Sequence, residues 1–292
     1  MKMSAEARAA LLFLAPALLL IFLFFFAPVV AGFALSLTDF DLYSIGDIHN
    51  LRFVGLHNYR ELAGSSIFWQ AFFNTMLFAL VGGPLTVFGS LVSALLVNAK
   101  LTRWKAMFRT IYFAPVVTTL VAVSIVFKYL YHPRFGIINR ALGVVGVPAI
   151  DWLGDPHWAL FSIIILAIWR QFGYSMIIFI AGLQTIPDEL YEAARIDGAG
   201  PWRQFRHVTL PMLAPTFLFV GIVTAIGYLQ LFAEPYVMTQ GGPLNHTLSA
   251  VMLMYQQGFK FWRMGYAAAV AFVLFLVVGS ATLVQLRFQR SR

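Results

Sequence analysis

Long apolar stretches alternate with short polar connections along the whole chain. Crossing a hydrocarbon core of about 30 Å takes roughly 20 helical residues, and six stretches reach that length. They lie near Leu11–Leu35, Phe68–Val97, Ala106–Tyr131, Ala159–Leu183, Pro215–Phe232 and Tyr266–Leu286. The pattern therefore predicts an all-α polytopic membrane protein, with six transmembrane helices in a single domain over residues 1–292.

The first apolar stretch can be compared with a secretory signal. Lys2 and Arg8 precede it, as basic residues precede the apolar core of such a signal. That core is about 7–15 residues long, whereas this stretch runs for about 25 residues. We therefore expect it to remain in the protein as a transmembrane helix.

Composition supports a lipid environment. Hydrophobic residues make up 60% of the chain and charged residues 11%. Water-soluble domains have roughly 45–50% and about 25%, so a water-facing globule is excluded. The chain contains no cysteine, which excludes disulfides, thiolate metal sites and a cysteine nucleophile.

The net charge of +8 is best understood from where the basic residues lie. Connections rich in Lys and Arg face the cytoplasm. With the N-terminus inside, twelve basic residues fall on the inner side: Lys2, Arg8, Lys100, Arg103, Lys105, Arg109, Arg195, Arg203, Arg206, Arg287, Arg290 and Arg292. Six fall on the outer side: Arg52, Arg60, Arg134, Arg140, Lys260 and Arg263. This predicts cytoplasmic N- and C-termini, and no nucleic-acid partner is implied.

Three further segments carry local signals. Ser36–Ile67 is the longest connection, polar and bounded by aromatic residues. Leu248–Phe261 is too polar to span and is interpreted as an interfacial or re-entrant helix. Gly82-Gly83-Pro84 is expected to kink the second span.

The connection between the fourth and fifth stretches, residues 184–214, begins with signals for a helix. Thr185 can cap it and Pro187 suits its first turn. Asp188 and Glu189 lie near the positive helix end, where acidic residues are favoured. This helix is expected to run to Ile196.

The same connection then carries signals for a bend and a second helix. Asp197-Gly198 favours a left-handed stop, because glycine has no Cβ to clash at positive φ. Pro201 can start a second helix over Trp202–Val208, and Pro211 is expected to end it. Residues 184–214 are therefore predicted to form helix, sharp bend and helix, called the polar hairpin below.

One face of the first hairpin helix collects residues at helical spacing: Leu190, Ala193, Ala194 and Asp197. The two alanines would let another surface approach closely, and Glu192 and Arg195 flank the face. Two interpretations stay open at this point. The hairpin either packs on its own bundle or docks into another protein.

The stretch EAARIDGAGPWRQFRHVTLP resembles the signature loop of permease subunits in binding-protein-dependent ABC importers. Glu192, Ala193, Ala194, Gly198, Leu210 and Pro211 match that signature, and Val208 replaces the usual isoleucine. FVGLHNYREL, GLQTIPDELYEAA, YVMTQGGPLNHT and GYAAAVAFVL resemble further parts of one subtype, with His57 where Asp is commoner. That subtype is the first membrane subunit of sugar importers of the maltose, glycerol-3-phosphate and lactose type.

The resemblance implies a coupling helix in the polar hairpin, set in a cleft of a cytoplasmic ATP-binding subunit. Glu192 would meet a basic group there, Ala193 and Ala194 would permit close docking, and Gly198 would make the bend. Asp197, Leu210 and Pro211 belong to the same coupling site.

The resemblance also implies partners and a location. The partners are a second homologous permease subunit, two copies of the ATP-binding subunit, an extracytoplasmic solute-binding protein and membrane lipid. The location is a bacterial or archaeal cytoplasmic membrane. None of the chain's five lysines lies in a G-x-x-x-x-G-K-[ST] phosphate loop, so no cofactor is expected here and ATP would be hydrolysed by the partner.

Polar residues inside the fourth and fifth stretches are candidates for the solute pathway. A central charge costs about 2.5–3.5 kcal/mol, so such groups face a cavity or a neighbouring helix. The candidates are Arg170, Gln171, Tyr174, Thr224, Tyr228 and Gln230. Hydroxyls, amides and aromatic faces suit a neutral polyol, although helix–helix hydrogen bonding is the commoner use of these groups.

Three rival functions are weighed against this interpretation. A proton-coupled secondary transporter would place carboxylates in the bundle interior, and the predicted spans hold no Asp or Glu away from their ends. An intramembrane enzyme is disfavoured because neither H-E-x-x-H nor G-x-S-x-G occurs, and no catalytic or metal-ligating residues are assigned. An ABC permease for a phosphorylated polyol, polyamine or peptide stays open.

Overall fold

The computed structural model describes residues 5–41, 44, 51–99 and 103–290, with side chains of 5–10 and 288–290 left out. Lys2, Lys100 and Arg292 lie outside these described residues, as do the side chains of Arg8 and Arg290. The orientation of the termini stays a prediction.

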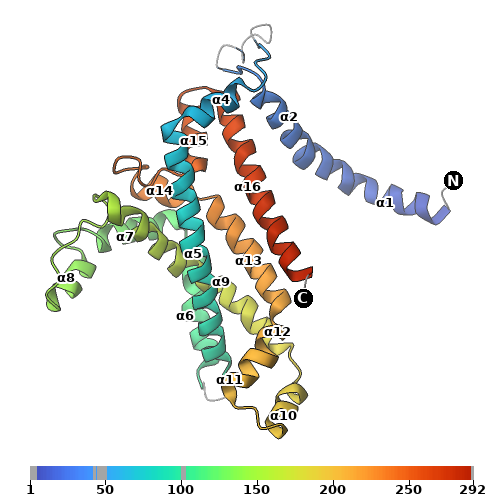
Figure 1. Ribbon diagram of the computed structural model, residues 1–292, viewed down its shortest axis with the longest axis vertical. Coiled ribbons are helices and arrows are strands. Elements are labelled where there is room, and N and C mark those ends of the chain that lie inside the picture. Colours follow the sequence, from blue (N-terminus) through green and yellow to red (C-terminus); the bar gives the residue numbers. More distant parts are fainter. Residues whose placement is uncertain (1–4, 42–43, 45–50, 100–102, 291–292) are drawn as a thin grey trace. The chain divides into compact units, whose positions relative to one another are not determined.

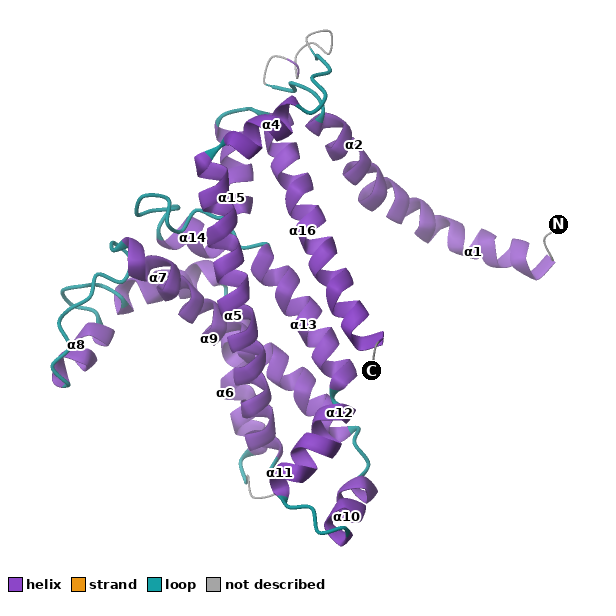
Figure 2. Ribbon diagram, viewed as in Figure 1, coloured by secondary structure: helices purple, strands orange, loops and turns teal. Residues whose placement is uncertain are grey.

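Most of the described chain is helical, and Figure 2 shows these helices in purple, joined by teal loops. Its one β feature there is an isolated bridge between Thr38 and Phe53. The helices are α1 Ala5–Ile21, η1 Phe22–Phe26, α2 Ala27–Ser36, α4 His57–Gly64, α5 Ser66–Asn98, α6 Lys105–Val117, α7 Leu120–Leu130, α8 Ile137–Val144, α9 Pro156–Gln184, α10 Asp188–Ile196, α11 Pro201–Gln204, η3 Phe205–Thr209, α12 Leu210–Met212, α13 Ala214–Leu229, α14 Ala233–Met238, α15 Ala250–Tyr255, η4 Gln256–Lys260 and α16 Met264–Arg290. The prediction of an all-α membrane protein is confirmed.

The chain divides into two compact units. One comprises Met1–Ser65 and Leu253–Val273, and the other comprises Ser66–Met252 and Leu274–Arg292. The single-domain prediction therefore stays a prediction, and each unit is described by itself.

The first unit is held by polar contacts around α4. The Asn58 side chain donates to the carbonyl oxygens of Ser36 and Thr38, each at 2.8 Å. Arg263 donates to both carboxylate oxygens of Glu61, at 2.6 and 2.7 Å. These bonds fix the loop after α2 and the start of α16 on α4.

The second unit is built around α5 and α9, with α6 and α13 packed against them (Figure 1). A Cβ on Gly173 of α9 would lie 1.8 Å from the Tyr112 carbonyl oxygen, so glycine permits the close approach of α6. Ser90 of α5 donates to the Phe172 carbonyl at 2.8 Å. Small residues and one buried hydroxyl thus bring these helices together, as is common between membrane helices.

The third apolar stretch is not one continuous helix. α6 and α7 meet at a bend of 98°. Between them Thr118 and Thr119 are extended, with ψ of 147° and 133°. Pro115 removes a helical N–H and β-branched residues follow it, which explains the break. Five described helices are long and apolar enough to span a membrane, or six if this bent pair counts as one span.

The fifth apolar stretch extends beyond the predicted boundary. α13 ends at Leu229, the helix breaks at residues 230–232, and α14 continues the span to Met238. Glu234 therefore lies within the span. The predicted boundary at Phe232 left out this carboxylate, which lies near the end of the longer span.

Candidate functional site

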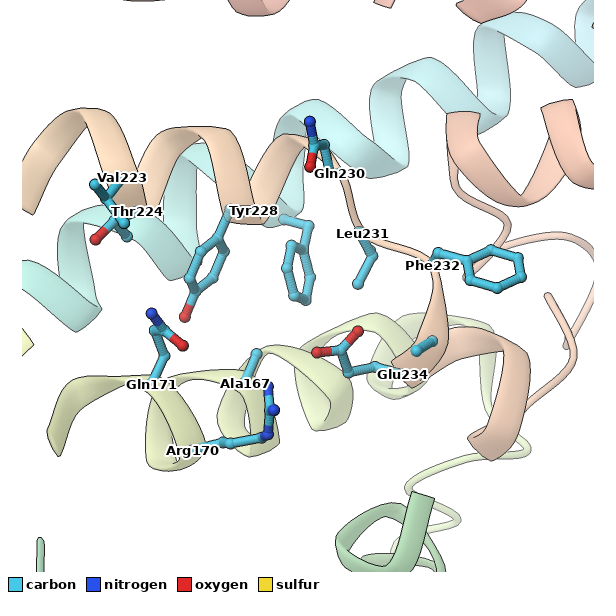
Figure 3. A pocket seen from close by; sticks show the side chains of 13 residues that line it. Ala167, Arg170, Gln171, Val223, Thr224, Tyr228, Gln230, Leu231, Phe232 and Glu234 are labelled. Carbon is cyan, nitrogen blue, oxygen red and sulfur yellow. The ribbon is translucent and has the colours of Figure 1, made fainter. Parts of the chain in front are cut away.

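A cavity of about 310 Å³ opens within the second unit. Its walls come from α5, α9, α13, α14 and the break between the last two (Figure 3). The lining residues are Phe78, Ala167, Arg170, Gln171, Val223, Thr224, Gly227, Tyr228, Gln230, Leu231, Phe232, Ala233 and Glu234. Polar or charged residues make up six of these thirteen, so the wall offers hydrogen-bonding groups as well as apolar surface.

Two buried polar atoms of this cavity have no hydrogen-bond partner among the described residues. They are the Nε of Arg170 and the Oγ1 of Thr224, and Thr224 is 3% exposed. Buried polar groups are paired in the great majority of cases, so each exception calls for an explanation. A polar ligand or ordered water in the cavity would supply the missing partners.

The cavity holds one residue of each charge. Arg170 lies on α9 and Glu234 on α14, and Figure 3 shows both beside the same space. Both residues are described, and no direct ion pair joins them. The formal charges of the lining cancel, which favours an uncharged ligand or one that carries both polar and apolar faces.

Tyr228 forms one wall by tight packing. Its ring lies 4.9 Å from that of Phe78, and its Oη is 2.5 Å from the Oγ1 of Thr86. A Cβ on Gly82 would lie 2.3 Å from the Cε1 of Tyr228, so glycine at that position makes room for the ring. The hydroxyl of Tyr228 is therefore engaged with α5, and its ring is the part that a ligand can contact.

The structure brings together five of the six residues proposed for the solute pathway. Arg170, Gln171, Thr224, Tyr228 and Gln230 line the cavity. Tyr174 does not, and it is 37% exposed. It lies one helical turn beyond Arg170, past the end of the lining on α9. Their part in transport stays a prediction.

Sequence analysis missed Glu234. The predicted fifth span ended at Phe232, two residues before Glu234. The signal that was available is the apolar sequence that resumes with Pro235 and runs to Met238. Among the described residues, no group of three or more His, Asp or Glu side chains is placed to hold a metal ion.

The polar hairpin bends where the sequence predicts. α10 ends at Ile196, and Gly198 has a φ of +75°. The Ala199 N–H donates to Ala194 at 2.8 Å and the Gly198 N–H donates to Arg195 at 3.0 Å. This pair of bonds is the Schellman motif, which satisfies the last carbonyl groups of a helix.

The start of the hairpin differs from the prediction. Pro187 is the N-cap of α10, and no side chain in the described part of the chain caps that helix. Thr185 instead terminates α9, where its Oγ1 donates to the Gly182 carbonyl at 2.8 Å. The interpretation of Thr185 as the cap of α10 is wrong, because its hydroxyl reaches back to the preceding helix.

The second half of the hairpin is longer than predicted. α11 begins at Pro201, but helical structure continues through η3 and α12 to Met212. The Leu210 N–H donates to the Phe205 carbonyl, five residues back. This wider turn accommodates Pro211, which would otherwise clash with a carbonyl four residues earlier. Pro211 therefore does not end the second helix.

The hairpin is anchored on one side and open on the other. Leu213 is fully buried and Ile186 is 7% exposed, within the same apolar cluster. The Tyr191 hydroxyl lies 2.9 Å from the Oγ1 of Thr209 and joins the two halves. Away from these contacts Ile196 is 86% exposed and Trp202 70% exposed.

The proposed docking residues lie on the open side or at its edge. Leu190, Ala193 and Asp197 are exposed and Ala194 is half-buried. Glu192 is exposed and lies 3.8 Å from Arg195, a surface pair of little energetic weight. Leu210 and Pro211 are exposed on the second half. The hairpin thus presents small, apolar and acidic groups that no described residue covers.

Comparison with known proteins gives one family over nearly the whole chain. The sequence profile of the binding-protein-dependent transport system inner membrane component matches residues 8–292. The lactose transport system permease protein LacF of Rhizobium radiobacter is 40% identical over 96% of this chain and 94% of its own. The trehalose/maltose transport system permease protein MalF of Thermococcus litoralis is 32% identical over 98% of this chain and 95% of its own.

Solved structures show the same fold. A bacterial ABC transporter involved in the import of the acidic polysaccharide alginate matches with a TM-score of 0.79 at 22% identity. The match covers 97% of this chain and 96% of that chain. A second structure of an alginate transporter, in complex with a periplasmic protein that holds alginate pentasaccharide, matches with the same TM-score.

Proposed function

The chain belongs to the family of binding-protein-dependent transport system inner membrane components, and on this premise we propose that it is the permease subunit of an ATP-driven importer for a sugar or sugar-like solute. It is a multi-pass protein of the cytoplasmic membrane. The sugar class is supported by relatives named for lactose and for trehalose and maltose, which match over almost the entire chain.

The partners follow from this function. A second homologous permease would complete the translocation pathway, and two copies of an ATP-binding subunit would hydrolyse ATP. An extracytoplasmic binding protein would deliver the solute. The last partner is supported by the alginate transporter that was solved with its periplasmic protein.

The observation that carries the mechanism is that the polar hairpin joins the two helices whose polar residues line the cavity. α9 runs without interruption from Arg170 to the hairpin, and α13 runs from the hairpin to Thr224 and Tyr228. At 1.5 Å per residue, α9 separates Arg170 from Thr185 by roughly 20 Å. A partner that displaces the hairpin would therefore move both polar walls of the cavity.

The base of the hairpin is tight enough to transmit such a displacement. A Cβ on Gly182 would lie 2.5 Å from the Oγ1 of Thr216, so α9 and α13 touch there. Leu183 and Leu213 are buried beside this contact. Because packed helices move as rigid bodies, rotation of the hairpin tilts α9 and α13 together.

Docking of the hairpin can be tested by crosslinking, because the chain has no native cysteine. Ala193→Cys would be paired with a cysteine in the cleft of the ATP-binding subunit, with and without ATP. Ala141→Cys is the matched control, since it is also an exposed alanine on a short helix. We expect crosslinks at 193 only, with a yield that changes on ATP binding. Equal yields at both positions, or solute uptake without any ATP-binding subunit, would overturn the proposal.

The cavity can be tested by removing its two charges. Arg170→Gln and Glu234→Gln each leave the other charge unbalanced in an apolar surrounding, so each should reduce uptake of a neutral sugar several-fold. The double variant should recover part of the loss, because charge balance is restored. Uptake would be measured in reconstituted vesicles. If the loss in the double variant equals the sum of the two single losses, the two residues do not act as a pair.

A permease for another solute class is the second candidate. Relatives with similar identity include the sulfoquinovosyl glycerol permease SmoG of Agrobacterium fabrum, at 35%. This sugar derivative is anionic, so Arg170 could serve an acidic cargo. A panel of neutral and acidic sugars, offered to the complete importer, separates the two candidates.

A further inference from the structure

The connection between α7 and α9, residues 131–155, is unused by the proposed transport mechanism. It contains α8, which is fixed on one face. Asn139 is 8% exposed, donates to the Ile150 carbonyl at 2.8 Å, and accepts the Trp152 indole N–H at 2.8 Å. Ile138 and Leu142 pack on the apolar cluster below. These contacts fix the orientation of α8, and therefore which residues lie on its opposite face.

That opposite face is apolar and open. Val144 is 86% exposed, Val145 74%, Ile137 65% and Phe135 48%. Ile137, Ala141 and Val144 recur at helical spacing, so they form one stripe along α8. Two exposed arginines flank the stripe. The α8 patch is defined as Arg134, Phe135, Ile137, Arg140, Val144 and Val145.

The charges on α8 and on the residues just before it are basic. Residues 131–150 contain two arginines and no Asp or Glu, and Asp151 and Asp155 follow at the far end of the connection. Among the described residues neither Arg134 nor Arg140 forms an ion pair. Large apolar side chains beside unpaired cations are typical of helices that lie in the membrane interface and attract anionic lipid.

Both ends of the connection carry aromatic residues of the kind that mark that interface. Tyr129, at the end of α7, is 66% exposed, and Trp158, at the start of α9, is 41% exposed. Exposed Tyr and Trp gather at the level of the lipid headgroups. The connection between them therefore starts and ends at the level of the lipid headgroups, where a membrane-surface helix lies.

We propose that the α8 patch is a membrane-surface anchor for anionic phospholipid. Ile137, Val144 and Val145 insert below the headgroups, and Arg134 and Arg140 bind lipid phosphates. A protein that covered the same face would need acidic groups to meet the arginines. Phospholipid supplies both the acyl surface and the negative charge.

The test is lipid quenching of a single fluorescent label on the complete importer in vesicles. Val144→Cys would be labelled with an environment-sensitive dye, and Ile196→Cys is the matched control because its parent side chain is also 86% exposed. Quenchers would be attached to lipid near the headgroup or dissolved in water. We expect a blue-shifted emission at 144 that lipid quenchers reduce, and no such quenching at 196. Access of the aqueous quencher to 144, or access of neither quencher, would overturn the proposal in favour of solvent or a protein partner.

The charge component has its own measurement. With the label at 144, Arg134→Gln and Arg140→Gln together should remove the increase in lipid quenching between phosphatidylcholine vesicles and vesicles that contain phosphatidylglycerol. An unchanged increase would overturn phosphate binding by the arginines. Neither measurement requires transport, so failure of this proposal is distinct from failure of the proposed transport function.

Discussion

The cavity and the polar hairpin belong to the same compact unit, yet opposite kinds of contact define them. Residues far apart in the chain meet in the cavity, as Tyr228 does with Gly82 and Thr86. In the hairpin the defining bonds are local, as between Ala199 and Ala194. One site depends on how helices approach each other, and the other on how a short segment caps itself.

This difference predicts how substitutions act. A change in the cavity alters packing, and hence stability as well as transport. A change on the open side of the hairpin disturbs at most the weak surface pair of Glu192 and Arg195, so it mainly alters what docks there. Stability and uptake measured together therefore separate the two regions.

The largest effect is expected from charge reversal on the hairpin. On the proposed function, Glu192→Lys would place a cation opposite a basic group of the ATP-binding subunit, and loss of a charge pair of this kind costs about 2–5 kcal/mol in an interface. Uptake should be abolished while the thermal stability of the purified chain stays within about 0.5 kcal/mol, since the residue is exposed.

Glu189→Lys is the control for this prediction. It lies on the same helix and is also exposed, but it belongs to the first turn and is not part of the family signature that Glu192 matches. It costs about 0.3–1 kcal/mol through the helix dipole, and uptake should persist. Equal loss of uptake in both variants would assign the effect to net charge instead of docking.

The second prediction concerns the cavity wall. Gly82→Ala would bring a Cβ to 2.3 Å from the Cε1 of Tyr228 and push the ring away from Phe78. Overpacking of this kind costs about 1–3 kcal/mol, so both melting temperature and uptake should fall. Gly89→Ala, on the same helix with nothing within 4 Å of its new Cβ, should leave both unchanged. A stable Gly82→Ala protein would mean that the ring has room to move.

Local signals explain why the hairpin could be predicted in part. Gly198 was placed correctly because a left-handed stop depends on the glycine itself. The roles of Thr185 and Pro211 were predicted wrongly because the sequence allows two local conformations at each position. The hydroxyl of Thr185 bonds to the preceding helix, and a wider turn absorbs Pro211. Where two local solutions compete, packing decides.

The cavity could be predicted only as a set of polar residues on two helices. The sequence placed these polar residues on the fourth and fifth stretches, but it did not show which of them face the same space. Glu234 was missed because the helix breaks before it and resumes. The bend between α6 and α7 was also missed, since hydropathy does not report direction. Both errors concern backbone direction, which neighbouring helices determine.

The third prediction returns to the bend of the hairpin. Gly198→Val would force a β-branched residue into a φ of +75°, at a strain of about 1–2 kcal/mol. That energy corresponds to roughly a tenfold loss of the docked geometry, so uptake should fall about tenfold with insertion intact. Gly198→Asn should retain more activity, because asparagine tolerates the left-handed region.

Gly200→Val provides the matched control for the bend. Gly200 lies two residues further on, with a φ of −68°, and a Cβ there meets nothing within 4 Å. The same side chain at that position should leave uptake unchanged. If both valine variants lose uptake equally, the added bulk matters and the backbone conformation does not.

The smallest effect tests local capping where no partner is involved. Asp155 is the N-cap of α9, and its carboxylate accepts the His157 N–H at 2.8 Å. This bond holds the pKa of Asp155 below its ordinary value of 3.8, so the carboxylate stabilises the fold above that pH. The contribution is lost as pH falls through the lowered folded pKa. Asp155→Asn keeps a capping oxygen but cannot ionise, so it should melt slightly below the parent chain at neutral pH and together with it under strongly acidic conditions. A melting difference that persists in acid would show that cap geometry, rather than charge, is what α9 requires at this end.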